Sequence, residues 1–505
     1  MRIAIVGAGI SGIAAASILN KAGHTTVLFE KSADIGGVWA VGYPEVGLQN
    51  TFYQYALSQF PWPFTPHHHP TASEIMRYLH MAVEHLRLDV RFEHDVTNVL
   101  DSDNGWEVKY TNSDGQHSER FDYLISAVGQ YTEGKHRPDF PGMETFRGEI
   151  ITEREVTDLG TFSGKKTAII GFGKSALDMS SMAVRNASQV YHVFRTPRWM
   201  IPFQIFGIHY SNLLFSRIAT FMIPCWVQPT RVERFLHSYL KPLVALNWMG
   251  LTAYIKASIR LRGWFRGKAS RNRLKSIIPD HSFVSDMRSA AALCPDAYLP
   301  AVATGEIEPH HASLSAFDET GVVLTSGQHI DCDLVLLCTG SETPSFPFFP
   351  DKYREILERE NDGLQLYRHV IHPEIPNCAF AGYNHGFMHV PAAEIGMVWL
   401  CAVIDNNLTL PSKEIMLESI DTVLNWKRQN INYEPSRSCA VNTRFQQYID
   451  SMLNELGFSP YRKLPNLLAE FFRPYGSKDY AAVIDEYLQQ KASHPAPREV
   501  LAADI

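Results

Sequence analysis

Two glycine-rich loops constrain the fold of this chain more than any other feature of its sequence. Each follows a short apolar run that is typical of a buried strand, and each precedes a helix-like run. Glycines in this context let the backbone approach a pyrophosphate at the N-terminus of a helix. The chain is therefore expected to be an α/β protein with two Rossmann-like dinucleotide-binding domains, a tight turn in another α/β protein being the alternative. The first loop is Gly7, Ala8, Gly9, Ile10, Ser11 and Gly12, and the second is Gly171, Phe172, Gly173, Lys174, Ser175 and Ala176.

The two units differ in the residue that ends their second strand. Glu30 follows the strand-like run 26–29, whereas Arg195 follows the run 189–194. A carboxylate accepts hydrogen bonds from ribose hydroxyls and repels a 2′-phosphate, whereas a guanidinium pairs with that phosphate. We therefore assign FAD to the first unit and NADPH to the second. A purely structural role for Arg195 is the alternative.

Two further apolar runs, 123–129 and 334–340, end in Gly129 and Gly340, and each follows an aspartate. They resemble the segments by which two-dinucleotide flavoproteins cross between their nucleotide domains. By pattern alone, each is equally typical of any buried strand with a tight exit.

Several motifs beyond the first loop make the chain similar to the flavin-containing monooxygenase family over nearly its whole length. They include the glycine turn 36–39, the run 48–51, the run 195–199 and the segment 379–382 followed by Ala393 and Glu394. The resemblance implies that Asn50 lies against the reactive face of the flavin and acts as the catalytic residue. It implies FAD contacts by Gly7, Ala8, Gly9, Ile10, Ser11, Gly12, Glu30, Lys31, Gly37, Val38, Trp39, Asn50, Thr51, Val96 and Gly129, NADPH contacts by Gly171, Gly173, Lys174, Ser175, Ala176, Asp178, Arg195 and Thr196, and cofactor contacts by Thr339 and Gly340.

The same resemblance implies a reaction in which a flavin hydroperoxide transfers one atom of O₂ to a small organic substrate, with NADPH as reductant. We expect N- or S-oxygenation, because the motif typical of Baeyer–Villiger relatives is altered: Thr152 stands in place of its histidine and Val156 in place of its aromatic residue. Baeyer–Villiger oxidation of a ketone is the alternative. A flavoprotein disulfide reductase would require a redox cysteine pair, and an oxidase or a nucleotide sensor would use the same two loops.

Charge is distributed unevenly along a chain of net charge −7. Between Asp178 and Asp280 there are 15 Lys and Arg residues and one acidic residue, Glu233. This block includes an apolar, basic stretch at about 203–275, for which we expect a helical insertion that covers the substrate entrance. The basic amphipathic part, 253–275, leaves peripheral contact with an anionic membrane as the alternative.

Seven cysteines without paired spacing are typical of reduced thiols, so we expect a cytoplasmic protein, with membrane association left open. Nothing in the sequence indicates nucleic-acid binding, and homodimer formation is left open. The histidines at 67–69 and at 310–311 predict loops rather than metal ligands. The segment 384–389 is a candidate lining of the substrate pocket, and no metal site is predicted.

The order of these motifs predicts three parts. Residues 1–155 form the first part of the FAD-binding domain, and 156–332 form the NADPH-binding domain with its insertion. Residues 333–505 complete the FAD-binding domain and add C-terminal helices.

Overall fold

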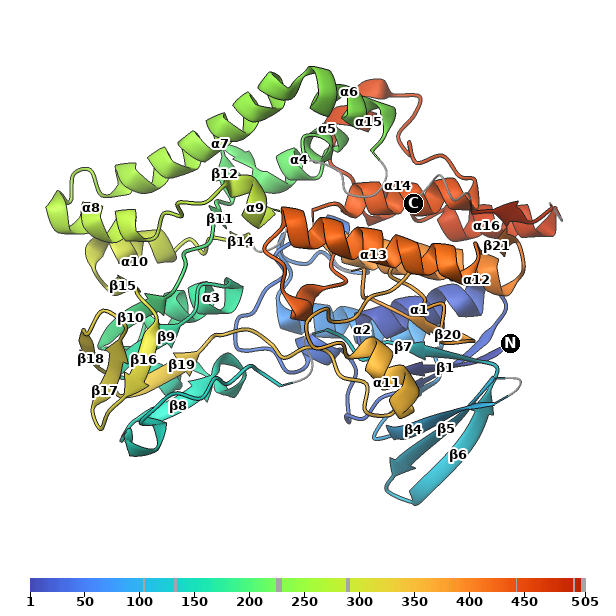
Figure 1. Ribbon diagram of the computed structural model, residues 1–505, viewed down its shortest axis with the longest axis horizontal. Helices are drawn as coiled ribbons and strands as arrows, with labels where there is room; N and C mark the ends of the chain where they lie inside the picture. The colour runs from blue at the N-terminus through green and yellow to red at the C-terminus, as the bar shows by residue number, and fades with distance from the viewer. Residues whose placement is uncertain are drawn as a thin grey trace.

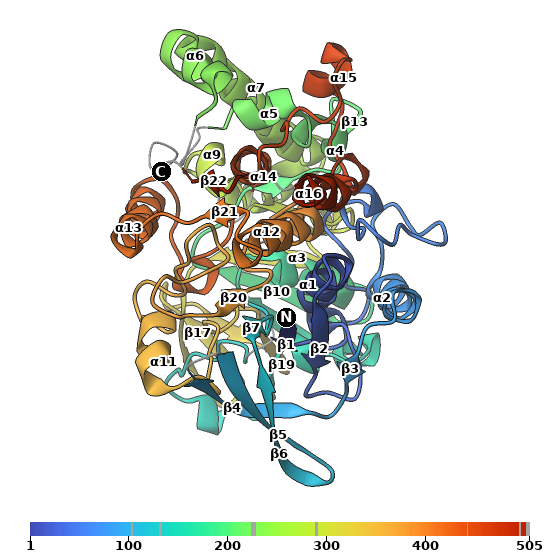
Figure 2. The ribbon, with the colours of Figure 1, turned by 90° about the vertical axis from the view of Figure 1, so that its right-hand side faces the viewer.

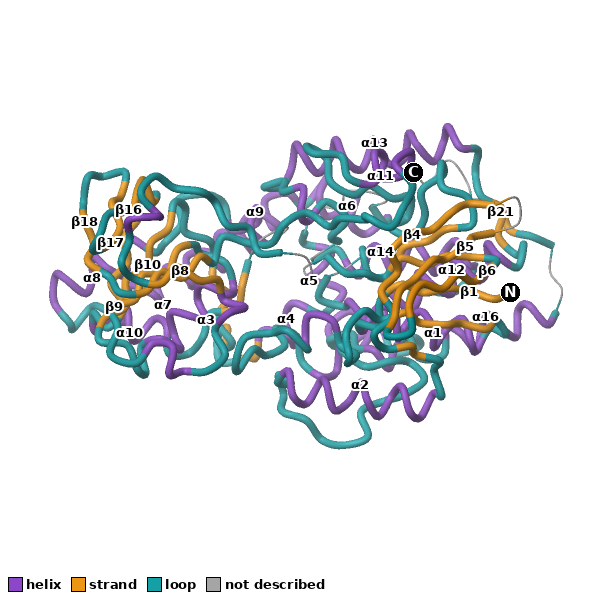
Figure 3. The backbone as a smooth tube through the Cα atoms, turned by 90° about the horizontal axis from the view of Figure 1, so that it is seen from below, coloured by secondary structure: helices purple, strands orange, loops and turns teal. Residues whose placement is uncertain are grey.

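The computed structural model describes residues 1–102, 105–130, 134–223, 229–287, 291–384, 386–441, 443–493 and 496–500. Two parallel sheets lie side by side in it, one at each end of the molecule (Figures 1 and 3). The predicted fold class, with two Rossmann-like domains, is confirmed.

The first sheet has the strand order β20-β7-β1-β2-β3 and is parallel throughout. Helix α1 (Ile10–Lys21) connects its first two strands. The last strand to join comes from the second half of the chain, so this domain closes only when the chain returns. Its strands are β1 (Arg2–Val6), β2 (Thr25–Phe29), β3 (Val90–Arg91), β7 (Tyr123–Ser126) and β20 (Cys378–Phe380).

The second sheet has the order β15-β10-β9-β19-β8 and is also parallel. Helix α3 (Lys174–Ala183) begins within its glycine loop and continues into the helix-like run predicted after it. The strands are β8 (Glu149–Thr152), β9 (Lys166–Ile170), β10 (Gln189–Phe194), β15 (Ile307–His311) and β19 (Leu334–Leu337).

A small antiparallel sheet covers one face of each parallel sheet. Side chains alternate along a strand, so Ile3 and Ile5 of β1 face α1, whereas Ala4 and Val6 pack on the first antiparallel sheet. The second parallel sheet repeats this layering. The antiparallel strands are β4 (Asp95–Ser102), β5 (Gly105–Asn112), β6 (Gly115–Phe121), β16 (Leu314–Phe317), β17 (Gly321–Leu324) and β18 (His329–Asp331).

A helical insertion leaves the second domain after β10 and extends over the first (Figure 1). The basic stretch 253–275 forms two helices rather than one, because α7 ends at Arg262 and the chain turns through 263–266 before α8. The elements are β11 (Met200–Ile201), β12 (Gln204–Ile205), β13 (Ile208–His209), α4 (Tyr210–Leu214), α5 (Arg217–Phe221), α6 (Arg231–Tyr239), α7 (Lys241–Arg262), α8 (Gly267–Ser276), α9 (Phe283–Met287), β14 (Ala292–Leu293) and α10 (Tyr298–Thr304).

Arg217 explains how a charged residue is accommodated in the apolar start of the insertion. Its side chain is fully buried and pairs with Asp450 and Glu470 of the C-terminal region. A buried guanidinium requires such partners, so these pairs attach the insertion to the C-terminal helices. Positions 224–228 of the predicted apolar stretch lie outside the described residues. Within the described part of the chain, no helix is both long and apolar enough to cross a membrane.

The C-terminal helices complete the layer above the first sheet (Figure 2). The apolar helix α12 packs directly on α1, and α14 packs on α12. The remaining elements are α2 (Ala72–Leu86), α11 (Asp351–Leu357), α12 (His389–Ile404), β21 (Leu408–Thr409), α13 (Lys413–Asn430), α14 (Phe445–Leu456), α15 (Leu467–Phe472), α16 (Val483–Ala492) and β22 (Arg498–Glu499).

Candidate active site

The first glycine loop leaves no room for side chains between β1 and α1. Gly7 has a φ of 106°, and a Cβ atom there would lie 2.5 Å from the carbonyl oxygen of Ala127. A Cβ atom on Gly12 would lie 2.0 Å from the carbonyl oxygen of Gly7. Both positions therefore require glycine, and the exposed backbone N–H groups at the start of α1 are suited to a phosphate.

Glu30 is buried beside this loop. Its carboxylate accepts hydrogen bonds from the backbone N–H of Ala8 at 2.9 Å and of Ser32 at 3.0 Å. Lys31 follows it and is exposed, whereas Val96 is buried in β4 among Val6 and Phe29. Glu30 thus holds the loop and presents an acceptor at the end of β2, where a ribose would lie.

A second glycine turn lies against the first loop. The N–H of Gly36 donates to the carbonyl of Ala8 at 3.0 Å, and Gly36 and Gly37 have φ angles of 105° and 55°. Val38 and Trp39 follow, and the Trp39 indole N–H donates to the Tyr55 hydroxyl at 2.8 Å. The turn therefore forms one wall of the same cradle.

Asn50 and Thr51 are both buried beyond this turn. The Asn50 amide donates to the carbonyl of Phe387, and the Thr51 hydroxyl donates to Gln54. Gln54 in turn donates to the carbonyl of Tyr475 at 3.0 Å. The Asn50 loop is therefore held by segments that come from far along the chain.

The C-terminal return also reaches the first glycine loop. The Ser11 hydroxyl lies 3.0 Å from Nε2 of His389, the first residue of α12. A Cβ atom on Gly382 would lie 2.1 Å from the Ser11 hydroxyl oxygen. Residue 385 of the predicted pocket segment lies outside the described residues.

The second glycine loop repeats the construction of the first. Gly171 has a φ of 128°, and a Cβ atom there would lie 2.3 Å from the carbonyl oxygen of Cys338. Gly173 precedes α3, and Lys174, Ser175 and Ala176 form the first turn of that helix.

Asp178, one turn further along α3, connects the two domains. It pairs with Lys174 and accepts a hydrogen bond at 2.6 Å from the hydroxyl of Tyr43, which belongs to the first domain. Burial and the nearby Asp178 carboxylate raise the pKa of Tyr43, so the hydroxyl stays protonated. Arg195 and Thr196 lie exposed beyond β10.

The end of the second predicted crossing segment, 334–340, pairs with the chain that follows the first. The Thr339 hydroxyl donates to the carbonyl of His136 at 2.5 Å, and the N–H of His136 donates to the carbonyl of Gly340 at 3.1 Å. Gly129 and Gly340 both have positive φ angles, of 86° and 100°. Each chain thus leaves its sheet by a tight glycine turn.

The altered motif at 152–156 forms a local turn. The backbone N–H and hydroxyl of Thr152 both donate to the Glu155 carboxylate, at 2.8 and 2.9 Å, and Val156 is buried. These positions therefore stabilise the entry to the second domain.

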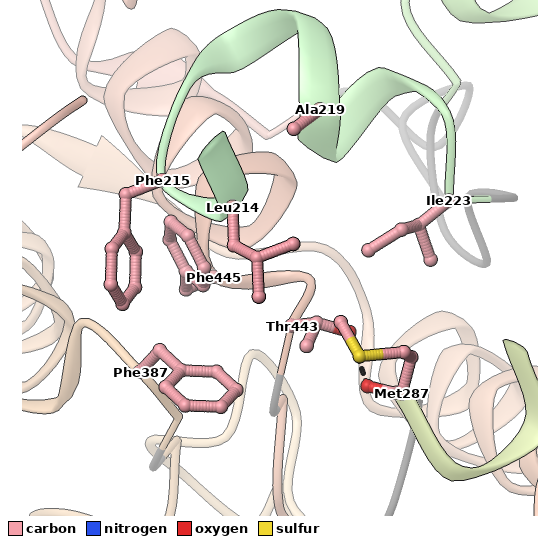
Figure 4. Close-up of a pocket in the computed structure, with 8 residues that line it drawn as sticks. All are labelled: Leu214, Phe215, Ala219, Ile223, Met287, Phe387, Thr443 and Phe445. Carbon is pink, nitrogen blue, oxygen red and sulfur yellow. Dashed lines mark hydrogen bonds between the residues drawn. The ribbon is translucent and has the colours of Figure 1, made fainter. Parts of the chain in front are cut away.

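An apolar pocket is lined by Phe387, whose backbone carbonyl binds Asn50, and by residues that were not predicted from sequence (Figure 4). Phe215 packs against Phe387 and Phe445, with ring centroids 5.7 and 5.5 Å apart. The Thr443 hydroxyl donates to the carbonyl of Met287 at 2.8 Å. The insertion and the C-terminal helices meet here, and the lining residues are Leu214, Phe215, Ala219, Ile223, Met287, Phe387, Thr443 and Phe445.

Together these features define a two-dinucleotide flavoprotein fold with an apolar pocket beside its buried asparagine. The sequence model for flavin-binding monooxygenase-like proteins matches residues 1–241 and 282–473. The chain belongs to this family and is a flavin-dependent monooxygenase family enzyme.

Individual relatives cover almost the whole chain. A probable flavin-containing monooxygenase 1 of Arabidopsis thaliana is 31% identical, over 95% of this chain and 96% of its own. The structure of S-allyl-L-cysteine S-oxygenase from Allium sativum is similar with a TM-score of 0.63 at 19% identity, covering 97% of this chain and 98% of the other. Cyclohexanone monooxygenase from Rhodococcus sp. Phi1, bound to NADP⁺, gives a TM-score of 0.60 at 16% identity and 97% coverage of both chains.

Proposed function

We propose that this enzyme uses FAD, NADPH and O₂ to oxygenate a neutral, apolar substrate at a soft heteroatom, with sulfur preferred over a protonated nitrogen. The observation that carries this proposal is the position of Asn50, held by the carbonyl of Phe387, which lines a pocket whose described residues are all uncharged.

The residues of the first domain fit FAD. Gly7 and Gly12 exclude side chains from the cradle, and Glu30 offers a buried acceptor at the end of β2. Arg195 occupies the corresponding place in the second domain and suits a 2′-phosphate, which supports NADPH there. A family relative whose structure is bound to NADP⁺ is consistent with this assignment.

Bound flavin and NADPH would supply two electrons, which with two protons reduce O₂ so that one oxygen atom joins the substrate and the other leaves as water. The protein would orient the substrate and the cofactors and exclude water from the site. We propose that the second N–H of the Asn50 amide donates to the reacting oxygen while the first is held by Phe387. Tyr43 and Asp178 would hold the two domains in register.

The pocket supports a neutral substrate. None of the lining residues that the structure describes is charged, and the Thr443 hydroxyl already donates to a carbonyl. Burying an ammonium group there would cost several kcal/mol without a compensating anion. A thioether or an uncharged amine would avoid that cost. A ketone is uncharged as well, so Baeyer–Villiger oxidation is the second candidate.

The deciding experiment mixes NADPH-reduced enzyme with oxygenated buffer in a stopped-flow spectrometer. A near-ultraviolet absorption band that persists for seconds supports an oxygenase, and immediate return of the oxidised flavin spectrum with equimolar peroxide would indicate an oxidase. Asn50→Ala should shorten the band's lifetime by about 10- to 100-fold. Asn186→Ala, an exposed asparagine, is the control and should not change it.

Substrate screening separates the two candidate reactions. A matched set of an apolar sulfide, its tertiary-amine analogue and its ketone analogue should be oxygenated in that order of kcat/KM. Faster conversion of the ketone to an ester would establish the Baeyer–Villiger alternative.

We also propose that the insertion contacts an anionic membrane surface. Several large apolar side chains there are exposed, and so are others on α15, which packs against α5 of the insertion. Basic residues interleave with them, among them Arg260, Arg262, Arg266 and Lys268. The apolar residues include Leu246, Met249, Leu261, Trp264, Phe265, Leu467, Leu468 and Phe472.

Co-sedimentation with phosphatidylserine-containing vesicles at physiological salt tests the membrane proposal. The double variant Phe265→Ser/Leu468→Ser should pellet much less than the parent. Phe92→Ser, at an exposed phenylalanine outside the insertion, should pellet normally. Failure of the parent to pellet would refute the proposal and leave the insertion as a cover for the pocket.

A further inference from the structure

Three histidines from two distant segments meet beside the Asn50 loop. His68 and His69 lie in the loop before α2, and His209 ends β13 of the insertion. One ring nitrogen from each lies within 4.8 Å of the others. The sequence showed only the adjacent histidines 67–69, because His209 joins them through the fold.

The geometry of His69 and His209 suits a shared ion. Their Nε2 atoms are 3.2 Å apart. Two nitrogen ligands of a tetrahedral zinc ion, each bound at about 2.0–2.1 Å, are separated by roughly 3.3 Å. The two rings therefore already have the spacing of neighbouring ligands.

Each of these two rings also has a partner on its other nitrogen. Nδ1 of His69 lies 2.8 Å from the carbonyl oxygen of Asn50, to which it can only donate. Nδ1 of His209 lies 2.8 Å from the Ser211 hydroxyl and accepts a hydrogen bond from the backbone N–H of Ser211 at 3.3 Å. Such outer hydrogen bonds fix the tautomer and orientation of metal-binding histidines. With Nδ1 of His69 protonated, its Nε2 carries a lone pair directed at the cluster.

Aromatic side chains surround His69 within the cluster. His69 stacks on Tyr210 at a centroid distance of 6.0 Å, and Phe203 packs against His69 at 5.1 Å. His67 does not join the cluster, because its Nδ1 pairs with Glu74 at 2.8 Å.

We propose that His68, His69 and His209 form a binding site for a divalent transition-metal ion of the zinc class. Imidazole ligands suit Zn²⁺, and a water molecule would complete the fourth position. In binding, the ring proton of His209 moves from Nε2 to Nδ1, which then donates a hydrogen bond to the Ser211 hydroxyl oxygen and gives up its contact with the Ser211 N–H, so no net proton release is required. The ion would join the loop at 67–70 to the insertion and, through His69, brace the backbone of Asn50.

The test titrates Zn²⁺ into chelator-treated, flavin-loaded enzyme by isothermal calorimetry, without NADPH or substrate. We expect one saturable site, weakened at least tenfold in His209→Ala and in His68→Ala. His67→Ala is the matched control from the same histidine run and should bind normally.

A second measurement distinguishes loss of the metal site from failure of a variant to fold. Zn²⁺ should raise the melting temperature of the parent and of His67→Ala, but not that of His68→Ala, whose exposed ring is removed without disturbing the core. Absence of saturable binding in the parent, or equal loss in His67→Ala and His209→Ala, would overturn the proposal. Neither result bears on the oxygenation chemistry, which is assayed separately.

Discussion

The two nucleotide units share one construction but differ in what surrounds it. In both, a left-handed glycine lies against the carbonyl of the strand that ends beside it, Ala127 for Gly7 and Cys338 for Gly171. At the end of the second strand, however, Glu30 is buried and holds two backbone N–H groups, whereas Arg195 is exposed. The common part is what any pyrophosphate needs, and the difference lies in the part that selects the nucleotide.

The two glycine loops also differ in how completely other segments cover them. The first loop is closed by the C-terminal return, through the contact of Ser11 with His389 and the close approach of Gly382. The second leaves Arg195 and Thr196 in solvent. We infer that the first unit retains its nucleotide as a prosthetic group and the second exchanges its nucleotide in each turnover.

Alanine at the first glycine of each loop should have the largest effect. Gly7→Ala places a Cβ atom 2.5 Å from a carbonyl oxygen at a φ of 106°, so we expect purified protein with at least tenfold less bound flavin. Gly171→Ala should retain flavin, measured by its visible absorbance, but lose reduction by NADPH. Gly250→Ala, on the open surface of α7, is the control. Loss of flavin in Gly171→Ala would contradict the division of roles.

We expect a buried carboxyl group that packs on the first domain to make the stability of the protein depend on pH. Glu394 of α12 accepts three hydrogen bonds from Ser58, at 2.9 to 3.0 Å, but burial raises its pKa from 4.5 to about 8. The folded protein therefore keeps this proton where the unfolded chain loses it. Stability from this group is fully present below pH 4.5, falls as pH rises, and levels off above pH 8.

Glu394→Gln should remove this dependence, since the amide stays neutral. We expect its free energy of unfolding to exceed that of the parent by a few kcal/mol at pH 8 and by much less at pH 5. Denaturant unfolding at the two pH values measures the difference. If the difference in free energy of unfolding between variant and parent did not change with pH, Glu394 would be ionised in the folded protein.

Arg195→Ala should have the next largest effect, and only on the second unit. Losing charge-assisted bonds to a 2′-phosphate costs about 1.5–3 kcal/mol, so the KM for NADPH should rise roughly 10- to 100-fold. The KM for NADH should change little. Arg185→Ala, which removes an exposed partner of Glu45, is the control. Equal losses with both nucleotides would mean that Arg195 has only a structural role.

Local signals predicted the loops and strands well, and long-range contacts explain what could not be predicted. The strands at 26–29 and 189–194 and the helix after each loop could be located because their patterns lie within a few residues. The bond from Asn50 to Phe387 spans 337 residues, and that between His69 and His209 spans 140. No periodicity reports such pairs, because they depend on how the domains pack.

Arg217 is another residue whose contacts could not be predicted from the sequence. In sequence it interrupts an apolar run, which argues against a membrane span but does not identify its partners. Only the fold brings Asp450 and Glu470 to it. The basic stretch is divided into α7 and α8 by a break at 263–266, where a Cβ atom on Gly263 would lie 2.8 Å from Cδ1 of Leu274, a contact that the sequence pattern does not report.

Ionic strength should give the smallest effect and still distinguish the two units. Exposed charges are screened, with a Debye length that falls from about 10 Å at 0.1 M salt to about 3 Å at 1 M. Arg195 is exposed, so the KM for NADPH should rise several-fold over this range, and the rise should shrink in Arg195→Ala. We expect flavin retention to depend on the buried Glu30 and the glycine cradle, and therefore to stay constant in the same buffers. If flavin were lost over the same range of salt in which the KM for NADPH rises, both nucleotides would be held by exposed charge. The two units would then not differ in how they bind their nucleotides.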